Sequence, residues 1–390
     1  MNTEGGRNMS TIAASKAEQA KGKTGFSLID CDVHPYMRDG LFDLAPYMTT
    51  EWRHRLGLAD VSGWAKHING GTVGMPKNEF YRISSGALRS DTAPPNGGVP
   101  GSDPAFVAQQ LLDEYEIDRA ILIGGPNSGH GAFPHAPSLA AVCSAYNDWI
   151  LDTWCSTDKR YLAAILVPPT DAELAVQEIE RLADRPGVAA IHMPVSDIAP
   201  GEKHFYPVYE AAQHYGLPIM IHPGATESIY VKAPRLSFVP TFYLEFHTLL
   251  TQPAMSSVVS LICHGVFERF PRLKYVFAEC GFAWAVDVMW RLERDWKAQR
   301  VEVPWVKKHP FEYLESNVRF TTQPFYEAEK REQIHAVLDV IRAEKTLLFS
   351  SDYPHWDFDD PRRALADLPK PMRERVFSQN AIETFGDRLS

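Results

Sequence analysis

Short apolar runs alternate with amphipathic stretches along most of this chain. The amphipathic stretches, such as DAELAVQEIERLAD and EAEKREQIHAVLDVIRAEK, place apolar residues three or four positions apart. That spacing is typical of helices that pack by one face, whereas short, uniformly apolar runs are typical of buried strands. The pattern predicts eight strands, at residues 27–34, 119–124, 161–168, 188–194, 218–224, 274–281, 317–324 and 346–351.

Strands that are apolar throughout, each followed by a helix, predict a parallel sheet covered by helices. Eight repeats of this unit favour a closed (β/α)8 TIM barrel over an open doubly wound sheet. The open sheet is further disfavoured because no glycine-rich dinucleotide-binding motif follows the first strand. The sequence therefore predicts an α/β protein built on one barrel.

Two segments depart from this alternation. Residues 1–24 are polar and rich in Lys, Ala, Ser and Gly, which predicts a disordered N-terminal tail before a single barrel domain at 25–390. Residues 67–103, after the first strand, are rich in Gly, Pro, Asn and Ser. Because the loops that follow barrel strands open onto the catalytic face, we expect this insertion to form a lid. The alternative is an irregular surface loop.

Composition limits the expected partners and location. The 390 residues are 45% hydrophobic and 23% charged, as in ordinary globular proteins, and carry a formal net charge of −10. Without a cluster of Lys and Arg, nucleic acid is not an expected partner. No apolar run suits a membrane span or a secretory signal, and the five scattered cysteines are expected to stay reduced. We therefore predict a cytoplasmic protein with no membrane partner.

Ionisable residues gather at the predicted carboxyl ends of the strands, where barrels of this type hold their active sites. Asp32 and His34 are two positions apart, so both side chains point to the same side of the first strand. Later strands end in His192, His222, Glu279 and Asp352. Converging carboxylates repel one another unless a cation lies between them. These residue types predict ligation of Zn, Mn or Fe, with one or two ions per chain.

Simpler interpretations remain open for two of these residues. A single histidine at a strand end, such as His192, also fits a loop or packing role. Glu279 is also placed to cap the following helix, FAWAVDVMWRLERDW, where the helix dipole favours a carboxylate.

The segments that carry these residues resemble signature segments of the amidohydrolase superfamily: IDCDVHP, YGLPIMIHPG, GVFERFPRLKYVFAECG and LLFSSDYPHWD. The resemblance covers about residues 28–385 and is strongest to the amidohydrolase-related (amidohydrolase 2) branch around aminocarboxymuconate-semialdehyde decarboxylase. It implies a distorted (β/α)8 barrel with a metal at its C-terminal mouth, and commonly a homodimer. Carried over to this sequence, it implies metal ligands at Asp32, His34, His222 and Asp352.

The sequence departs from the family pattern at two positions. Asp32 replaces the first histidine of the His-x-His motif, and Glu279 replaces a sixth-strand histidine that in the decarboxylases orients water or moves a proton. Glu279 and Asp352 are therefore the predicted catalytic groups, with His264 as another candidate for the missing histidine. The added carboxylate favours Mn or Fe over Zn, and it leaves open a second metal bridged by Glu279.

Three kinds of chemistry fit these residues. The first is non-redox decarboxylation of a small cyclic, aromatic or unsaturated acid, in which basic residues of the insertion, Lys77, Arg82 and Arg89, bind the acid group. Those charges also fit a solvated loop. The second is metal-dependent hydrolysis of a lactone or amide bond, and the third is oxygenation by one or two non-haem iron ions.

Two further expectations complete the site. A binding module without metal is disfavoured, because the converging carboxylates would then lack a compensating charge. His355 and Asp357, just beyond the eighth strand, are predicted to orient the metal ligands from outside.

Overall fold

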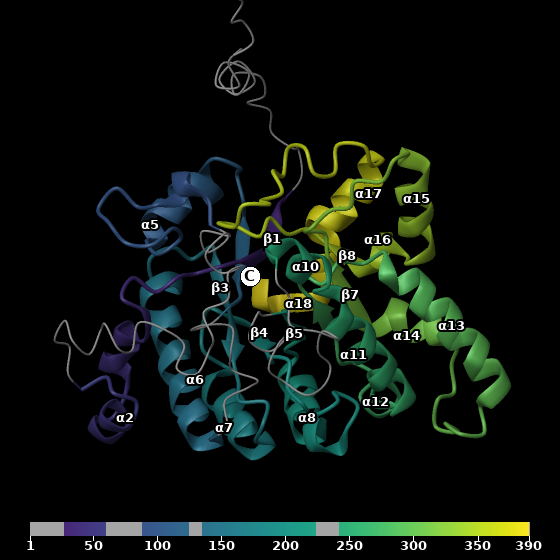
Figure 1. Ribbon diagram of the computed structural model, residues 1–390, viewed down its shortest axis with the longest axis horizontal. Helices are drawn as coiled ribbons and strands as arrows, with labels where there is room; N and C mark the ends of the chain where they lie inside the picture. Colours follow the sequence, from purple (N-terminus) through teal and green to yellow (C-terminus); the bar gives the residue numbers. More distant parts are fainter. Residues whose placement is uncertain (1–26, 60–87, 125–134, 224–241, 390) are drawn as a thin grey trace, which may run out of the picture.

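The computed structural model describes residues 27–59, 88–124, 135–223 and 242–389. Eight parallel strands follow one another around the sheet in chain order, and helices surround them (Figure 1). This arrangement confirms the predicted (β/α)8 fold. The strands are β1 Ile29–Val33, β2 Arg119–Leu122, β3 Tyr161–Leu166, β4 Val188–His192, β5 Ile219–Ile221, β6 Tyr275–Phe277, β7 Val318–Thr321 and β8 Leu347–Leu348.

The first and last strands meet through the backbone beyond β8. The N–H of Cys31 donates to the carbonyl of Phe349 at 2.9 Å, and the N–H of His34 donates to the carbonyl of Tyr353 at 2.8 Å. Between them, the N–H of Asp352 donates to the carbonyl of Asp32 at 3.1 Å. These bonds bring the segments that hold Asp32 and Asp352 side by side.

Helices cover the outside of the barrel, and α6, α7 and α8 lie next to one another along it (Figure 1). The α7 helix begins at a sequence-encoded cap, because the Asp171 carboxylate accepts the N–H groups of Glu173 and Leu174. The helices are α2 Thr50–Arg55, α5 Pro104–Val107, α6 Ala136–Ile150, α7 Ala172–Leu182, α8 Tyr206–Tyr215, α10 Tyr243–Thr248, α11 Thr251–Cys263, α12 Val266–Arg269, α13 Trp284–Gln299, α14 Pro310–Asn317, α15 Arg331–Val340, α16 Ala343–Thr346, α17 Lys370–Glu374 and α18 Asn380–Phe385.

Shorter helical segments join these elements. The 3-10 segments are η1 Gly40–Tyr47, η3 Ser90–Thr92, η8 Lys203–Phe205 and η10 Gly386–Leu389, and the π segments are η4 Ala108–Asp113, η7 Leu151–Cys155 and η9 Arg375–Gln379.

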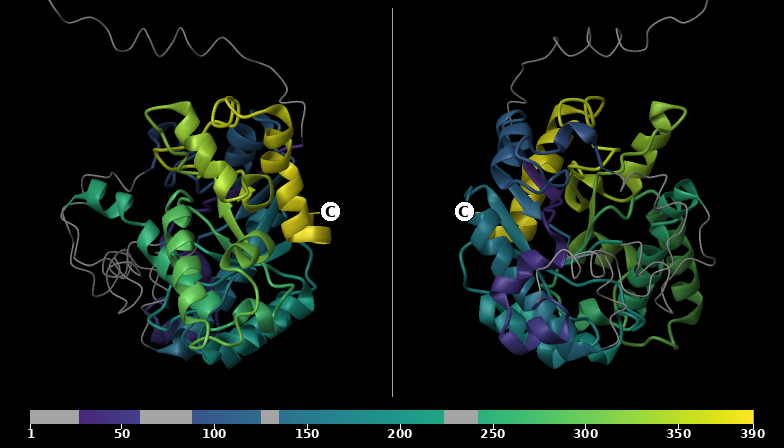
Figure 2. Two further views of the ribbon diagram at one scale, coloured as in Figure 1. Left: turned by 90° about the vertical axis from the view of Figure 1, so that its right-hand side faces the viewer. Right: turned by 60° about the vertical axis from the view of Figure 1, so that its left-hand side comes forward.

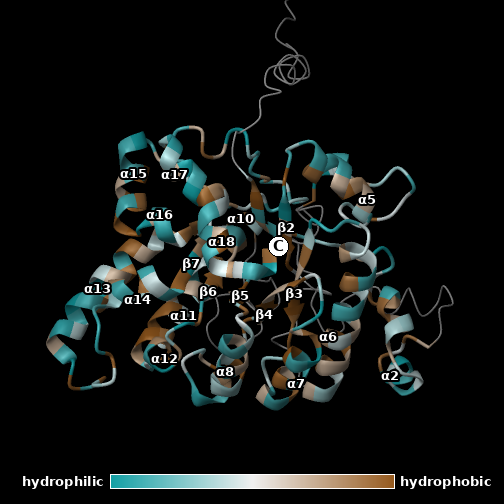
Figure 3. Cartoon of the chain, turned by 180° about the vertical axis from the view of Figure 1, so that it is seen from behind, coloured by the Kyte–Doolittle hydropathy of each residue, from teal (hydrophilic) through white to brown (hydrophobic). Residues whose placement is uncertain are grey.

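Apolar side chains fill both the barrel and the layer around it. The interior cluster draws on most of the strands and includes Ile29, Cys31, Ile121, Met220 and Val276. A larger cluster lies between the strands and the helices. Figure 3 shows hydrophobic colour concentrated on the strands and hydrophilic colour on the outer helices. This burial is the main force that holds the barrel together.

The C-terminal segment closes the end of the barrel opposite the carboxyl ends of the strands. Phe385 of α18 joins the interior cluster. The side chain of Arg388 donates to the carbonyls of Ala183 and Tyr215, which precede β4 and β5, and Arg119 donates to the carbonyl of Leu389 at 2.8 Å. Both views in Figure 2 show this yellow segment against the blue part of the chain. The end of the barrel where the carboxyl ends of the strands lie is therefore available for a functional site.

Several sequence predictions fall outside the described residues. These include the tail at 1–24 and residues 67–87 of the candidate lid, with Lys77 and Arg82. Residues 88–103 of the insertion are described, and Leu88 pairs with His355 in an isolated antiparallel bridge. Whether the insertion forms a lid stays a prediction. None of the helices in the described ranges is long and apolar enough to cross a membrane.

Candidate metal centre

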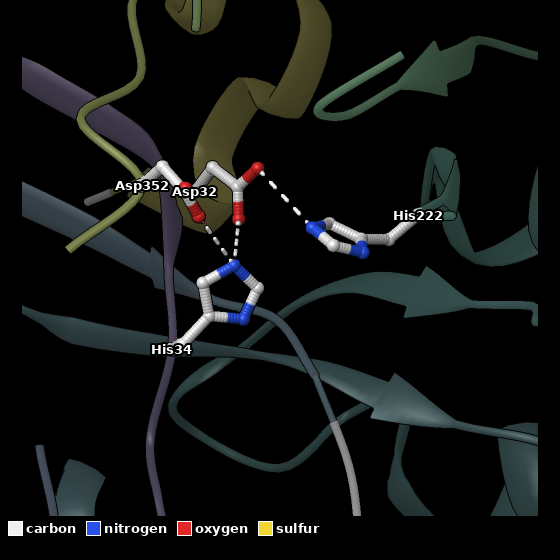
Figure 4. Close-up of side chains that lie close together, drawn as sticks. All are labelled: Asp32, His34, His222 and Asp352. Carbon is white, nitrogen blue, oxygen red and sulfur yellow. Dashed lines mark ion pairs between the residues drawn. The ribbon is translucent and has the colours of Figure 1, made fainter. Parts of the chain in front are cut away.

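Four side chains meet at the carboxyl ends of three strands. Asp32 lies in β1 and His34 directly after it, His222 follows β5, and Asp352 follows β8 (Figure 4). Nε2 of His34 lies 3.2 Å from Oδ1 of Asp32 and 2.9 Å from Oδ1 of Asp352, and Nε2 of His222 lies 3.7 Å from Oδ2 of Asp32. One ligand atom from each of the four lies within 4.8 Å of the others. This spacing suits a single metal ion.

Asp32, His34 and Asp352 are buried, the His222 side chain is 11% exposed, and the four are incompletely satisfied, as expected of metal ligands. Asp32 and Asp352 have no exposed surface. Both carboxylate oxygens of Asp32, Oδ2 of Asp352 and the Nε2 atoms of His34 and His222 have no aligned hydrogen-bond partner among the described residues. A buried carboxylate without donors is costly, and a divalent cation removes that cost. The residues therefore fit the predicted ion.

Backbone carbonyls fix the orientation of two imidazoles. Nδ1 of His222 lies 2.8 Å from the carbonyl of Pro223, and Nδ1 of His192 lies 3.1 Å from the carbonyl of Gly124. Because a carbonyl only accepts, each Nδ1 carries the proton and each Nε2 keeps its lone pair. In His222 that lone pair faces the cluster, as metal ligation requires.

A bulge in β1 directs Asp32 and His34 into the barrel. Asp30 pairs with Ala120 and Val33 pairs with Leu122, so β1 has one extra residue between these pairs. An extra residue reverses the alternation of side chains along a strand. The alternation of β1 therefore changes just before the ligands, after Ile29 and Cys31 have packed into the interior cluster.

The carboxylate of Asp30 supports this bulge. Its Oδ1 atom accepts the N–H of Asp32 at 3.2 Å and the N–H of Ser351 at 2.9 Å. Asp30 is fully buried. The sequence analysis did not single out this residue, although it precedes Asp32 by two positions in the motif IDCDVHP.

Two acids of the site have left-handed backbone conformations. Asp352 has φ 59° and Glu279 has φ 48°. Residues other than glycine rarely adopt positive φ, and such strain is concentrated at functional sites. Each of these acids lies just beyond the end of its strand, where the left-handed turn directs it toward the barrel mouth.

Glu279 lies between two imidazoles. Its Oε2 atom is 2.8 Å from Nε2 of His222, and its Oε1 atom is 3.5 Å from Nε2 of His247. His247 belongs to α10 and also lies 3.2 Å from Oδ2 of Asp357. His247 was not among the predicted site residues, because it lies inside a helical segment and not at a strand end. The alternative in which Glu279 only caps a helix does not account for these two contacts.

Asp352 makes a second set of contacts on its other side. Oδ1 of Asp352 lies 2.6 Å from Nδ1 of His355, and Nε2 of His355 lies 2.9 Å from the hydroxyl of Tyr36. The side-chain amide of Gln323 donates to Oδ2 of Asp357 at 2.7 Å. His355 thus contacts Asp352, and Asp357 contacts His247, positions from which side chains could orient the groups of the site.

The surroundings shift the pKa values of these groups in opposite directions. Burial alone would lower the pKa of His34, but the facing carboxylates of Asp32 and Asp352 raise it well above its usual value. The pKa of His222 is raised in the same way by Asp32 and Glu279. Burial raises the pKa of Asp352. Burial would also raise the pKa of Glu279, but the imidazoles of His222, His247 and His355 together lower it well below its usual value. Asp352 is thus the acid better suited to carry a proton.

The remaining predicted residues lie apart from the four ligands. His192 is buried and bonded to Gly124, and it is absent from both clusters of converging ligand atoms in the described residues. His264 ends α11 and lines a cavity of about 710 Å³ with residues of α11 and α13 such as Met255 and Asp287. This placement gives no support to a catalytic role for His264.

Arg89 is engaged in contacts of its own. Its guanidinium donates two hydrogen bonds to the carboxylate of Asp91 and lies over the ring of Phe358 at 4.8 Å. It lines a separate cavity with Tyr115 and Tyr353, and none of the four ligands lines that cavity. A substrate-binding role for Arg89 would require it to leave Asp91. Arg82, which was predicted to bind the same acid group, lies outside the described residues.

Comparisons with known proteins agree with this centre. The Amidohydrolase family model (Amidohydro_2) matches residues 29–386. Gamma-resorcylate decarboxylase of Rhizobium radiobacter is 23% identical over 265 residues, which cover 64% of this chain and 76% of that protein. The 2-amino-3-carboxymuconate-6-semialdehyde decarboxylase of Dictyostelium discoideum is 25% identical over 175 residues, which cover 44% and 46% of the two chains.

A solved structure shares the fold over nearly the whole chain. It is the 5-carboxyvanillate decarboxylase of Novosphingobium aromaticivorans, complexed with manganese and 4-hydroxy-3-methoxy-5-nitrobenzoic acid. The match has a TM-score of 0.64 and 21% identity, and it covers 94% of this chain and 97% of that one.

The fold and the converging ligands define a metal-dependent barrel enzyme. More narrowly, the chain belongs to the amidohydrolase family whose model spans residues 29–386. The predicted family and enzyme class are thereby confirmed: the three relatives named above are decarboxylases.

Proposed function

We propose that this protein is a metal-dependent, non-redox decarboxylase of a small aromatic acid. The observation that carries the proposal is the convergence of Asp32, His34, His222 and Asp352 within 4.8 Å at the barrel mouth. The decarboxylase relatives supply the reaction class. Hydrolysis and oxygenation use similar residues, but no contact in the site favours them over decarboxylation.

We infer that the ion is Mn²⁺, held by Asp32, His34 and His222, with Asp352 beside it as the acid of the site. Carboxylate and imidazole donors suit Mn²⁺ or Fe²⁺, and two solved relatives are described with manganese. When bound, the ion would supply a Lewis acid for the oxygen atoms of the acidic substrate. The Pro223 carbonyl would fix the ring of His222, and the Asp30 carboxylate would hold the backbone of Asp32.

Decarboxylation also requires a proton. The bond between the ring carbon and the carboxylate breaks, its electron pair stays on the ring carbon, and that carbon takes up a proton as CO2 leaves. Asp352 is the candidate donor, because burial raises its pKa and His355 holds its carboxyl group from the other side. Glu279, which stays ionised, would instead hold the imidazoles of His222 and His247 in place.

Two further properties are part of the proposal. All five cysteines are unpaired, as expected in a reducing compartment, and we infer a cytoplasmic location. We also infer a homodimer, by analogy with the branch to which the sequence is similar. Gel filtration with light scattering would test the second inference, and a monomeric mass at micromolar concentration would contradict it.

The test of the activity is a substrate panel. Purified enzyme loaded with Mn²⁺ would be incubated with hydroxybenzoates, carboxyvanillate-type acids and muconate-type acids, and CO2 release would be measured together with the decarboxylated product. We expect release from at least one aromatic acid, and none from Asp352→Asn. No carbon loss from any acid by fully metal-loaded protein would overturn the proposal. Oxygen from labelled water in the product would indicate hydrolysis instead, and consumption of O2 would indicate oxygenation.

A further inference from the structure

Three aromatic side chains from two separate segments meet beside the metal centre and form what we call the aromatic wall. Tyr243 and His247 belong to α10, and Trp356 lies in the segment beyond β8. The rings of Tyr243 and His247 are stacked with their centroids 5.5 Å apart, and the ring of Trp356 lies 6.4 Å from the first and 5.7 Å from the second. The indole N–H of Trp356 donates to the hydroxyl of Tyr243 at 3.2 Å. These contacts join the two segments and fix the orientation of the indole.

The aromatic wall adjoins the acids of the centre. Nε2 of His247 lies 3.5 Å from Oε1 of Glu279, whose other oxygen contacts a metal ligand. Burial raises the pKa of Tyr243 despite the hydrogen bond from Trp356, and the nearby charges of Glu279 and Asp352 raise it further. The phenol of Tyr243 therefore lies close to the acids at the barrel mouth, and the wall borders the place where a substrate would bind.

Trp356 offers apolar surface at this place. It is 56% exposed, whereas Tyr243 and His247 are only partly exposed. An indole that is already held by a hydrogen bond loses little conformational freedom when a ring packs against it. The described acids and imidazoles of the centre offer charges and hydrogen bonds but little apolar surface. In the proposed function the ion binds the acid group, so the ring of an aromatic substrate needs an apolar surface beside the ion.

From these contacts we propose that Trp356 is a specificity-determining residue: the aromatic ring of the substrate stacks on its indole while the acid group binds at the metal. Tyr243 positions the indole through the hydrogen bond to its hydroxyl. A flat ring contacts a flat indole over its whole face, whereas a puckered ring of the same size touches it with only a few atoms. The wall therefore selects aromatic over saturated acids. The inference rests on the proposed function, which supplies the acid group and the ion.

Ligand affinity tests this inference independently of turnover. The full chain loaded with Mn²⁺ would be titrated calorimetrically with benzoate and with cyclohexanecarboxylate, which carry the same acid group on a flat and on a puckered ring. We expect the wild type to bind benzoate more tightly. Trp356→Ala should lower the affinity for benzoate by roughly 3- to 10-fold and change the affinity for cyclohexanecarboxylate by less than about twofold.

Three further variants separate stacking from a general loss of structure. Trp356→Phe keeps a flat ring and should retain most of the preference for benzoate. Tyr243→Phe removes the acceptor of the indole N–H and should weaken this preference less than Trp356→Ala does. Trp290→Ala is the matched control, because Trp290 is 58% exposed on the outer helix α13, and this variant should bind both ligands as the wild type does.

Three results would overturn the proposal: a wild type without a preference for benzoate, an unchanged affinity for benzoate in Trp356→Ala, or equal losses for both ligands in that variant. The affinities do not depend on CO2 release. A protein that keeps the preference due to Trp356 but decarboxylates no acid would contradict the proposed function alone, so the two proposals fail separately.

Discussion

The carboxylate of Asp30 accepts the backbone N–H of Ser351 at 2.9 Å, joining the first strand to the chain just beyond the eighth. The same Oδ1 atom accepts the N–H of Asp32. One buried side chain therefore holds together the two segments that supply Asp32 and Asp352. This contact explains how a short eighth strand, Leu347–Leu348, is still held in register with β1 at the metal centre.

Replacement of Asp30 should weaken both folding and metal binding. Asp30→Ala leaves the N–H groups of Asp32 and Ser351 without their acceptor, at a cost of about 1–3 kcal/mol for each buried group. Metal affinity should fall by roughly 10- to 100-fold, as when groups that orient ligands are removed. Urea unfolding and Mn²⁺ titration would measure the two effects. Asp30→Asn keeps the Oδ1 acceptor and is the control; equal losses in both variants would argue against this hydrogen-bonding role.

Metal binding should strengthen as the pH rises. In the metal-free protein, burial alone would lower the pKa values of His34 and His222, but the facing carboxylates raise both, which favours the protonated imidazoles. A bound divalent ion requires the neutral imidazole, so binding must release these protons. The affinity for Mn²⁺ should therefore increase with pH until it passes the raised pKa values. Calorimetric titrations in buffers of different ionisation enthalpy would count the protons; an affinity independent of pH between 6 and 8, roughly the histidine range, would contradict this prediction.

Asp352→Asn should abolish turnover while the fold is retained. The amide has the same shape but cannot carry the acidic proton and is a poor metal ligand. We expect a loss of roughly 100- to 10,000-fold in kcat, the range for removal of a general acid. Circular dichroism would verify the fold and steady-state assays the rate. Turnover at the wild-type level in this variant would exclude Asp352 from the reaction.

Asn147 should be among the most sensitive positions for stability outside the site. It is fully buried, and its amide donates to the carbonyl of Leu166 and to Glu178, while its oxygen accepts the N–H of Leu166. Asn147→Ala leaves the N–H and carbonyl of Leu166 in β3 without this partner, although Glu178 of α7 keeps its contacts with Arg181, and we expect a loss of about 2–3 kcal/mol in the free energy of unfolding. Ser144→Ala on the same helix is the control. A difference between the two variants below about 0.5 kcal/mol would show that Asn147 is dispensable.

The fold and the four converging ligands were accessible from the sequence. The eight apolar runs became eight parallel strands, and Asp32, His34, His222 and Asp352 meet at their carboxyl ends as predicted. The observed strands are shorter than the predicted runs: residues 346–351 contain a strand only at Leu347–Leu348. Beyond Leu348 the chain bends at the barrel mouth. The rest of the apolar run therefore forms only separate backbone hydrogen bonds with β1 and is not a regular strand.

Other residues of the metal centre could not be predicted from the apolar runs and the residues that follow them. His247 lies within α10, and only the three-dimensional placement of that helix brings its Nε2 atom to 3.5 Å from Glu279. Asp30 accepts backbone N–H groups at the bulge of β1, and Tyr36 contacts His355 through its hydroxyl group. Neither contact follows from the pattern of apolar residues.

Hydrophobic periodicity is a local property, so the sequence alone determined the strands, their parallel order and the residues that end them. Contacts between distant segments depend on loop paths, backbone bends and side-chain direction, which the periodicity does not encode. The tertiary structure therefore decided which imidazoles lie on either side of Glu279 and Asp352.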